Sequence, residues 1–395
     1  MLKLKRLRSA PLLAAIIIAL AGLLTLSALQ APVRGQDSCH PSNLSTANWR
    51  TDFCNSNVDF SEILVGNPVK GGIPSVTDPA MESIEEAAAW LSERSPVIAL
   101  EVEDEARAYP LAILMWHEIA NDEIAGKPVA VTFCPLCNSS VTFDRRVNGD
   151  VLDFGVSGLL RNSDLIMFDR QSETWWQQLT GEGLVGAYAG ALLDIVPSQV
   201  IGFGSFAERY PNGLVMSRET GYNRQYGTNP YSNYDSRPGR PFLFRGEIDQ
   251  RLDSAVDHVL AAIIGESAKA YPFEILREER VINDAIGETP IVVFFQSGVA
   301  SALGDYVIDT ARDIGTAGMY QSSFDGQILH FTANNHDGSF TDEETGSTWN
   351  AFGEAIAGEL AGSQLNWVHA FPHFWFAWAA FHPETEVYGM NESSG

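Results

Sequence analysis

Basic residues are scarce in this 395-residue chain, which has 25 Lys and Arg against 50 Asp and Glu and a formal net charge of −25. We find no basic stripe, and so acidic a surface repels nucleic acid. We therefore expect no nucleic-acid partner. Apolar residues make up 45% and charged residues 19% of the chain, which is typical of a globular protein rather than a disordered one.

Several common catalytic and cofactor motifs are absent. The chain has no Gly-x-Ser-x-Gly nucleophile turn, no His-Glu-x-x-His zinc helix, and no glycine-rich phosphate loop after a predicted strand. We therefore expect no nucleotide cofactor. The sequence indicates neither a reaction, nor a substrate, nor a protein partner, and it leaves open whether the protein is an enzyme.

Cysteine is rare as well, with four residues in two pairs. Cys39 and Cys54 lie in a polar stretch without strong periodicity. Outside the cytoplasm, two such cysteines form a disulfide that holds an N-terminal arm in place. We predict this disulfide.

The first 35 residues follow a targeting pattern. Basic residues occur from Lys3 to Arg8, and an uncharged run extends from Pro11 to Ala31. This is typical of a signal peptide, but the run is also long enough for a membrane anchor, which needs about 20 apolar residues. Both alternatives place the chain after Pro32 outside the cytoplasm, as a secreted, periplasmic or outward-facing anchored protein. Membrane contact is expected through this segment alone.

A tripeptide and its surroundings occur twice in the chain. Ala108-Tyr109-Pro110 returns as Ala270-Tyr271-Pro272, and Asn121-Asp122 returns as Asn283-Asp284 at the same offset of 162 residues. Such a gapless run of identities predicts two pseudo-equivalent repeats that form one compact body. The expected organisation is a leader or anchor (1–35), an N-terminal arm (36–82), repeat one (83–218), an ordered connector (219–247) and a degenerate repeat two (248–389).

Each repeat has the pattern of a strand-rich α+β fold. The strand running from Pro128 to Phe133 leads directly into Cys134, and Asn148-Gly149 is a strong hairpin signal. The other expected elements are a helix over 83–93, a hairpin of 97–102 with 106–109, a helical turn over 114–119, strands over 140–147 and 151–156 on either side of Asn148-Gly149, and a strand over 165–168.

The motif Cys134-Pro135-Leu136-Cys137 is the strongest chemical signal in the chain. Two thiolates at this spacing can bind one metal ion, form a reversible redox disulfide, or form a permanent structural one. At the repeat offset, Cys134, Cys137 and His117 correspond to Gln296, Val299 and Glu279. Their joint loss favours a metal site made of Cys134, Cys137 and His117.

The metal could be copper or zinc. Met167 would favour copper as a fourth ligand, although a methionine between apolar neighbours usually packs in the core. His369 and His373 lie in an aromatic cluster interrupted by Pro372, where packing is the expected role. The alternatives to metal binding are a thiol-disulfide oxidoreductase that uses the same cysteines, and a non-catalytic structural or binding scaffold.

The chain resembles the domain-of-unknown-function family 3179 from about Leu64 to Tyr388. The motifs that carry the resemblance are Trp116-His117-Glu118-Ile119, Asn121-Asp122, Cys134-Pro135-Leu136-Cys137 with Ser139, Phe143-Asp144-Arg145, Ser163-Asp164-Leu165, Asp169-Arg170, Trp176, Gly181-Glu182, Tyr226-Gly227 and Asn229-Pro230-Tyr231. The resemblance implies an exported prokaryotic protein and assigns no reaction or site. Asn138 departs from the family pattern, which resembles one with glycine directly after the second cysteine.

Overall fold

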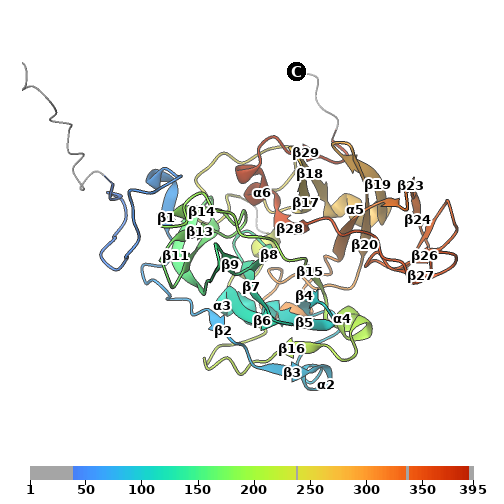
Figure 1. The fold of residues 1–395 in the computed structure, drawn as a ribbon, viewed down its shortest axis with the longest axis horizontal. Coiled ribbons are helices and arrows are strands. Elements are labelled where there is room, and N and C mark those ends of the chain that lie inside the picture. The colour runs from blue at the N-terminus through green and yellow to red at the C-terminus, as the bar shows by residue number, and fades with distance from the viewer. Residues whose placement is uncertain (1–38, 237–238, 335–337, 391–395) are drawn as a thin grey trace, which may run out of the picture. The chain divides into compact units, whose positions relative to one another are not determined.

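Short strands joined by tight turns build most of this protein (Figure 1). The computed structural model describes residues 39–236, 239–334 and 338–390, and all elements below lie in one compact unit of residues 41–395. Strands hold 40% of the residues and helices 12%, which confirms a strand-rich α+β fold. The predicted signal or anchor segment, 1–35, lies outside the described residues. Within the described ranges, no helix is both long and apolar enough to cross a membrane.

Three sheets occupy the first part of the chain, and a small ribbon of β9 (Arg146–Val147) and β10 (Asp150–Val151) accompanies them. The first sheet has the order β1 (Ile63–Val65), β11 (Phe154–Arg161), β12 (Asp164–Asp169), β13 (Trp175–Gln177), β14 (Gly183–Val185). The second has the order β2 (Val76–Thr77), β6 (Ile119–Ile124), β7 (Lys127–Cys134), β8 (Ser139–Asp144). The third has the order β15 (Gln199–Gly202), β4 (Pro96–Val102), β5 (Glu105–Pro110), β16 (Leu214–Met216), β3 (Met81–Ser83).

Three further sheets follow after residue 257, with a ribbon of β22 (Ser323–Phe324) and β23 (Gln327–Ile328). One sheet has the order β28 (Ala370–Phe374), β17 (His258–Ile264), β18 (Ser267–Pro272), β29 (Glu386–Val387). The next has the order β19 (Val281–Ile286), β20 (Thr289–Gln296), β21 (Thr316–Gln321). The last has the order β24 (Phe331–Ala333), β25 (Phe340–Asp342), β26 (Thr348–Trp349), β27 (Ala355–Ala357).

The helices are short and lie between strands. The α-helices are α2 (Ile84–Ala87), α3 (Leu111–His117), α4 (Phe203–Arg209), α5 (Phe273–Glu279) and α6 (Trp375–Phe381), and the 3-10 turns are η2 (Phe60–Glu62), η3 (Tyr234–Ser236) and η4 (Ile308–Thr310). Both α3 and α5 begin directly after a proline, whose fixed φ suits the start of a helix. Each ends at a residue with positive φ, Glu118 at 59° and Arg280 at 65°.

The element order β4, β5, α3, β6, β7 is followed later in the chain by β17, β18, α5, β19, β20. The two segments also share a polar contact, which is buried in the first segment and partly buried in the second. The Tyr109 hydroxyl donates to Asp122 (2.5 Å), and the Tyr271 hydroxyl donates to Asp284 (3.0 Å). In both segments the tyrosine therefore ties the second strand to the strand after the helix.

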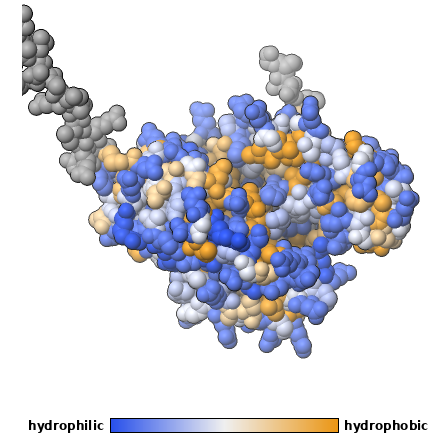
Figure 2. Space-filling model, viewed as in Figure 1, coloured by the Kyte–Doolittle hydropathy of each residue, from blue (hydrophilic) through white to orange (hydrophobic). Residues whose placement is uncertain are grey.

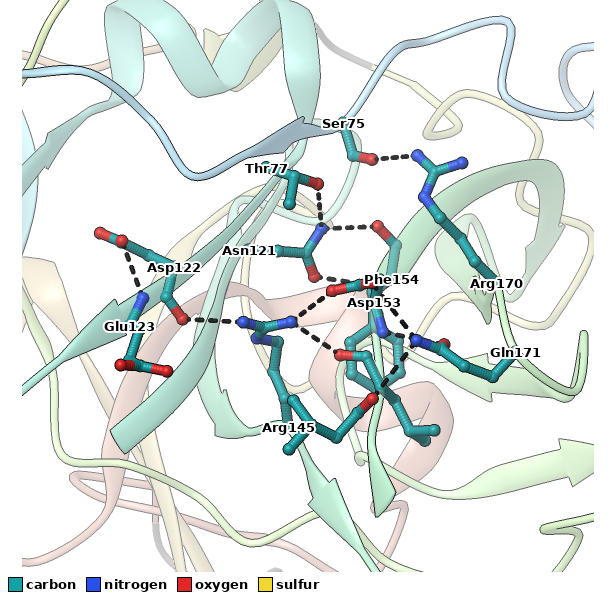
Figure 3. A network of polar contacts seen from close by, with 12 residues as sticks. Ser75, Thr77, Asn121, Asp122, Glu123, Arg145, Asp153, Phe154, Arg170 and Gln171 are labelled. Carbon is teal, nitrogen blue, oxygen red and sulfur yellow. Dashed lines mark hydrogen bonds and ion pairs between the residues drawn. The ribbon is translucent and has the colours of Figure 1, made fainter. Parts of the chain in front are cut away.

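A polar network connects β6 to the start of β11 (Figure 3). The Asn121 amide accepts from the backbone N–H of Phe154 and donates to its carbonyl, both at 2.8 Å. Asn283 makes the same pair of bonds with the backbone of Phe331, at 2.9 and 2.8 Å. Each asparagine therefore provides hydrogen-bond partners for both the N–H and the C=O of one buried phenylalanine, Phe154 or Phe331. We call this pair of bonds an asparagine clamp.

The predicted disulfide is confirmed, since Cys39 and Cys54 are bonded to each other. Phe53, next to Cys54, packs edge-on against Trp175 of β13, with the ring centroids 5.4 Å apart. The polar stretch around Cys54 is thereby anchored on the first sheet.

Two predicted elements differ from the structure. The helix over 83–93 is reduced to α2, which a capping box of Ser83 and Glu86 begins. The backbone then tightens into turns, and the Trp90 indole donates to Glu82 of β3 (2.6 Å). Asn148-Gly149 forms a turn, but the strands that it joins, β9 and β10, have two residues each. The longer strands on either side, β8 and β11, pair with other neighbours.

The main hydrophobic core draws on both parts of the chain. It contains Cys134 and Cys137 together with Val259, Phe374 and Trp375. On the face shown in Figure 2, hydrophilic residues cover most of the surface and apolar residues form smaller areas. The cysteine motif therefore belongs to the shared interior, and not to the acidic surface.

Candidate metal centre

The two cysteines occupy a tight turn between β7 and β8. Cys134 is the last residue of β7 and pairs with Ser139 of β8. The N–H of Cys137 donates to the carbonyl of Cys134 (3.2 Å), so both cysteines lie on one turn. Asn138 closes this turn with φ of 48°, in the left-handed region where glycine and asparagine are best tolerated. Asparagine at position 138, where the family pattern differs, therefore still suits this backbone angle.

A second hairpin brings Asp164 to the cysteines. β11 and β12 are joined by Asn162 and Ser163, which both have positive φ, as a type I′ turn requires. Asp164 is the first residue of β12 after this turn. The Cys134 thiol lies 3.9 Å from the carbonyl of Ser163, so the two hairpins meet at their turns.

Cys134, Cys137 and Asp164 form a compact group of possible metal ligands. One ligand atom from each lies within 4.8 Å of the others, and all three residues are buried. The two oxygens of Asp164 have different roles. Oδ2 accepts from Gln177 Nε2 (2.7 Å) and from the N–H of Leu179 (3.0 Å), whereas Oδ1 is buried without a hydrogen-bond partner among the described residues.

Burial shapes the electrostatics of this group. Burial raises the pKa of the Cys134 thiol, to which the charges of Asp164 and Glu118 add, and burial beside Cys134 raises the pKa of Cys137 well above its usual range. Burial also raises the pKa of Asp164 to about 6, although Gln177, Leu179 and the thiols favour its charged form. In the absence of a cation, the cysteines are therefore neutral thiols at neutral pH.

Glu118 is a second carboxyl group close to the cysteines, in addition to Asp164. Its carbonyl accepts from the N–H of Phe133 (2.8 Å), which places it next to the end of β7. Its side chain is only 8% exposed, and burial, helped by the charge of Asp164, raises its pKa to about 8. Glu118 and Cys134 line one cavity of about 380 Å³.

Segments from after residue 230 hold the cysteine turn in place. The Tyr234 hydroxyl donates to the carbonyl of Leu136 (3.1 Å), and the N–H of Phe374 donates to the carbonyl of Cys137 (2.8 Å). The Asn138 amide lies 3.2 Å from Nδ1 of the buried His258. Three consecutive residues of the turn are thus fixed from distant parts of the chain.

The structure places His117 in hydrogen bonds with other residues. Its Nδ1 lies 2.6 Å from the carbonyl of Pro74, and its Nε2 lies 2.7 Å from the hydroxyl of Tyr226. Burial lowers its pKa. Within the described part of the chain, the third member of the close group is Asp164, and both ring nitrogens of His117 already have oxygen partners.

Of the other candidate ligands, Met167 and His373 lie in packed surroundings and His369 does not. Met167 is fully buried in the main core and pairs with Trp176 across β12 and β13. His373 packs on Trp378, with the ring centroids 5.1 Å apart, and burial lowers its pKa to about 3. His369 is exposed just before β28.

Asp164 and Glu118 were not predicted as site residues. Both lie in motifs that carry the family resemblance, Ser163-Asp164-Leu165 and Trp116-His117-Glu118-Ile119. These motifs are the feature of the sequence that could have pointed to them. Among 50 Asp and Glu residues, the sequence does not tell which carboxylates are buried.

Comparison with known protein families gives one match. The family model described as "Protein of unknown function (DUF3179)" matches residues 70–385, which is most of the chain. Comparisons with curated proteins and with solved structures each found no significant match.

Proposed function

This chain belongs to the DUF3179 family of proteins of unknown function, and on that premise we propose that it binds a soft or borderline transition-metal ion through Cys134, Cys137 and Asp164. Two sulfurs and one carboxylate oxygen form a donor set that zinc accepts. Copper(I) prefers a set made of sulfur and imidazole alone. Zinc is therefore our first choice of metal and copper our second.

The observation that carries the proposal is the unpartnered Oδ1 of Asp164. A buried carboxylate oxygen without a hydrogen bond is costly and normally has a partner. Oδ2 is meanwhile fixed by Gln177 and Leu179, as expected for a ligand oriented by its surroundings. A cation beside Oδ1 and the two sulfurs would supply the missing partner.

The raised pKa values of both thiols oppose metal binding at neutral pH unless the ion itself displaces their protons. Cysteine binds metal as thiolate, so binding to these buried thiols releases protons. A bound dication reverses the effect of burial on both thiols. Three protein ligands leave a fourth position for an outside ligand, which is the arrangement of reactive rather than purely structural zinc sites.

The test is metal analysis of protein purified without chelator, by plasma mass spectrometry. We expect close to one zinc or copper per wild-type chain and a loss of at least tenfold in the Cys134→Ser, Cys137→Ser double variant, because serine does not replace a thiolate ligand. Equal metal content in both proteins would refute the proposal.

The third ligand is decided by two further variants. We expect Asp164→Asn to lower the metal affinity by about 10- to 100-fold, and His117→Gln to leave it within a fewfold of wild type. Asp104→Asn, at an exposed carboxylate in the β4–β5 turn, is the matched control. If His117→Gln removed the metal and Asp164→Asn did not, His117 would be the ligand as the sequence predicts.

A thiol-disulfide oxidoreductase is the second candidate, since both cysteines are free and close together. Reactive redox cysteines have a lowered pKa and are accessible, whereas burial raises the pKa of both thiols here. Thiol titration and mass mapping of the same samples distinguish the candidates. Cycling between two thiols and a disulfide near ambient potential would favour redox chemistry over metal binding.

We further propose that the chain arose by duplication and acts outside the cytoplasm. Three matching features support a duplication. They are the order of the elements, the contacts Tyr109–Asp122 and Tyr271–Asp284, and the hydrogen bonds of Asn121 and Asn283 to a phenylalanine backbone. The Cys39–Cys54 disulfide supports an oxidising compartment. In this proposal the second repeat has lost the ligands and stabilises the first.

A further inference from the structure

The cavity beside Cys134 is mostly apolar. Its volume is about 380 Å³, near the lower end of the range for small-molecule sites. Its apolar lining includes Leu159, Leu160 and Leu165 of the β11–β12 hairpin, Tyr231 and Phe242 of the connector, and Ile73. Such walls favour an aliphatic or aromatic body rather than a strongly hydrated one.

Glu118 is the one carboxyl group among the residues that line this cavity, whose other ionisable groups are the Cys134 thiol and the Tyr231 hydroxyl. It is more than nine-tenths buried, and among the described residues the influences on its carboxyl group are burial and the charge of Asp164, with no hydrogen bond. A buried carboxyl group without a partner is normally matched by a ligand or water. Because Glu118 and Cys134 face the same cavity, a ligand can reach the carboxyl group and the cysteine site together.

The charge of the cavity excludes one class of ligand. Its lining residues include no Lys, Arg or His, and Asp164 lies close behind Cys134. An anion would leave water without a cationic partner, next to two acidic groups. An uncharged ligand avoids this cost, and a hydroxyl or carbonyl group on it can share a hydrogen bond with the carboxyl group of Glu118.

We infer that this cavity binds a small uncharged molecule with an apolar body and one hydroxyl or carbonyl group, held by Glu118 beside Cys134. The inference rests on the proposed function in one respect. The polar group of the ligand would lie at the fourth position of the ion bound by Cys134, Cys137 and Asp164.

The experiment is isothermal titration of the full-length protein as purified, with its metal content measured on the same sample. The probes are 1-hexanol and hexanoate, which share a six-carbon chain and differ in charge. We expect 1-hexanol to bind at least tenfold more tightly than hexanoate. Glu118→Leu should weaken 1-hexanol binding about tenfold, which is the loss of one buried hydrogen bond, and Glu123→Gln, at an exposed position of β6, should not.

A second variant covers the case in which Glu118→Leu does not fold. Leu243→Asn reduces the apolar wall at a 47% exposed position whose φ of 54° suits asparagine. We expect it to weaken 1-hexanol binding several-fold at unchanged metal content.

The outcomes separate the two proposals. If 1-hexanol does not bind, or if hexanoate binds as tightly, while the metal content is normal, the ligand inference is overturned and the metal proposal stands. If wild-type protein holds no metal, the proposed function fails, and the titrations of that protein still decide whether the cavity and Glu118 take an uncharged ligand.

Discussion

Asn138 closes the cysteine turn with φ of 48° and contacts His258 through its amide group. These two features stabilise the same turn for different reasons. The backbone angle suits asparagine and glycine better than other residues, whereas the contact at 3.2 Å requires the asparagine side chain.

Two substitutions at Asn138 separate these features. Asn138→Gly loses the contact alone, and we expect a loss of about 1 kcal/mol in the free energy of unfolding. Asn138→Ala also keeps a Cβ at a left-handed φ without the polar side chain that lets asparagine tolerate it, so we expect about 2 kcal/mol. Urea unfolding of both variants measures the difference, and equal losses would mean that the backbone angle contributes nothing.

At the same scale, the sequence predicts some residues of the proposed metal site and misses others. Cys134 and Cys137 are recognisable because they are rare and follow a predicted strand. Asp164 is not, because its role depends on a hairpin that brings it back to a turn 27 residues earlier in the chain. The structure instead gives both ring nitrogens of His117 oxygen partners from Pro74 and Tyr226, segments far away in the sequence.

Between elements, the Asn121 clamp joins β6 to the start of β11 (Figure 3). This contact matters to the candidate site because β6 follows Glu118 and β11 leads to Asp164. It fixes the distance between the two strands by two hydrogen bonds to one backbone unit.

Asn121→Ala would leave the buried N–H and C=O of Phe154 unpaired. We expect a loss of about 2–4 kcal/mol in the free energy of unfolding, since each unsatisfied buried group costs about 1–3 kcal/mol. Thr77→Val is the control, because Thr77 accepts only a long bond of 3.4 Å from the same amide, and it should cost under about 0.5 kcal/mol. Denaturant unfolding checks both, and similar losses for the two variants would contradict the clamp.

Secondary-structure elements were predicted best where the pattern of apolar residues and the length of the segment both indicated a strand. The β4–β5 hairpin and β7 lie close to their predicted ranges because β4 and β7 are nearly continuous apolar runs of strand length between polar turns. Asn148-Gly149 correctly marks a turn, but strand partners are chosen by packing over long distances. β11 pairs with β1 and β12 rather than with β8, and local signals carry no information on that choice.

For the molecule as a whole, Asp235 of the connector is a central electrostatic contact. It accepts from Ser301 (2.5 Å) and from Arg312 (2.9 Å), and it lies 3.8 Å from Nε2 of His258. Burial tends to raise its pKa, but His258, Ser301 and Arg312 outweigh burial and hold the pKa of Asp235 well below its ordinary value of 3.8.

The direction of this shift sets the sign of a pH effect. Because the folded state lowers the pKa, the stabilisation by Asp235 is fully present above about pH 4 and is lost as the pH falls further. Asp235→Asn should reduce the free energy of unfolding by about 3 kcal/mol at pH 7, and its difference from wild type should shrink towards pH 2. Urea unfolding of both proteins between pH 7 and pH 2 measures this difference in the free energy of unfolding. Asp253→Asn, at an exposed position, is the control, and a difference that did not vary with pH would contradict the assignment.

The contacts around the cysteine turn also have a consequence for the biosynthesis of the protein. Leu136, Cys137 and Asn138 are fixed by Tyr234, Phe374 and His258, and Phe374 is made well after both cysteines. While the chain is still being synthesised, the thiols are already present but the turn that orients them is not yet supported. In the proposed metal centre, binding of the ion therefore belongs after chain completion.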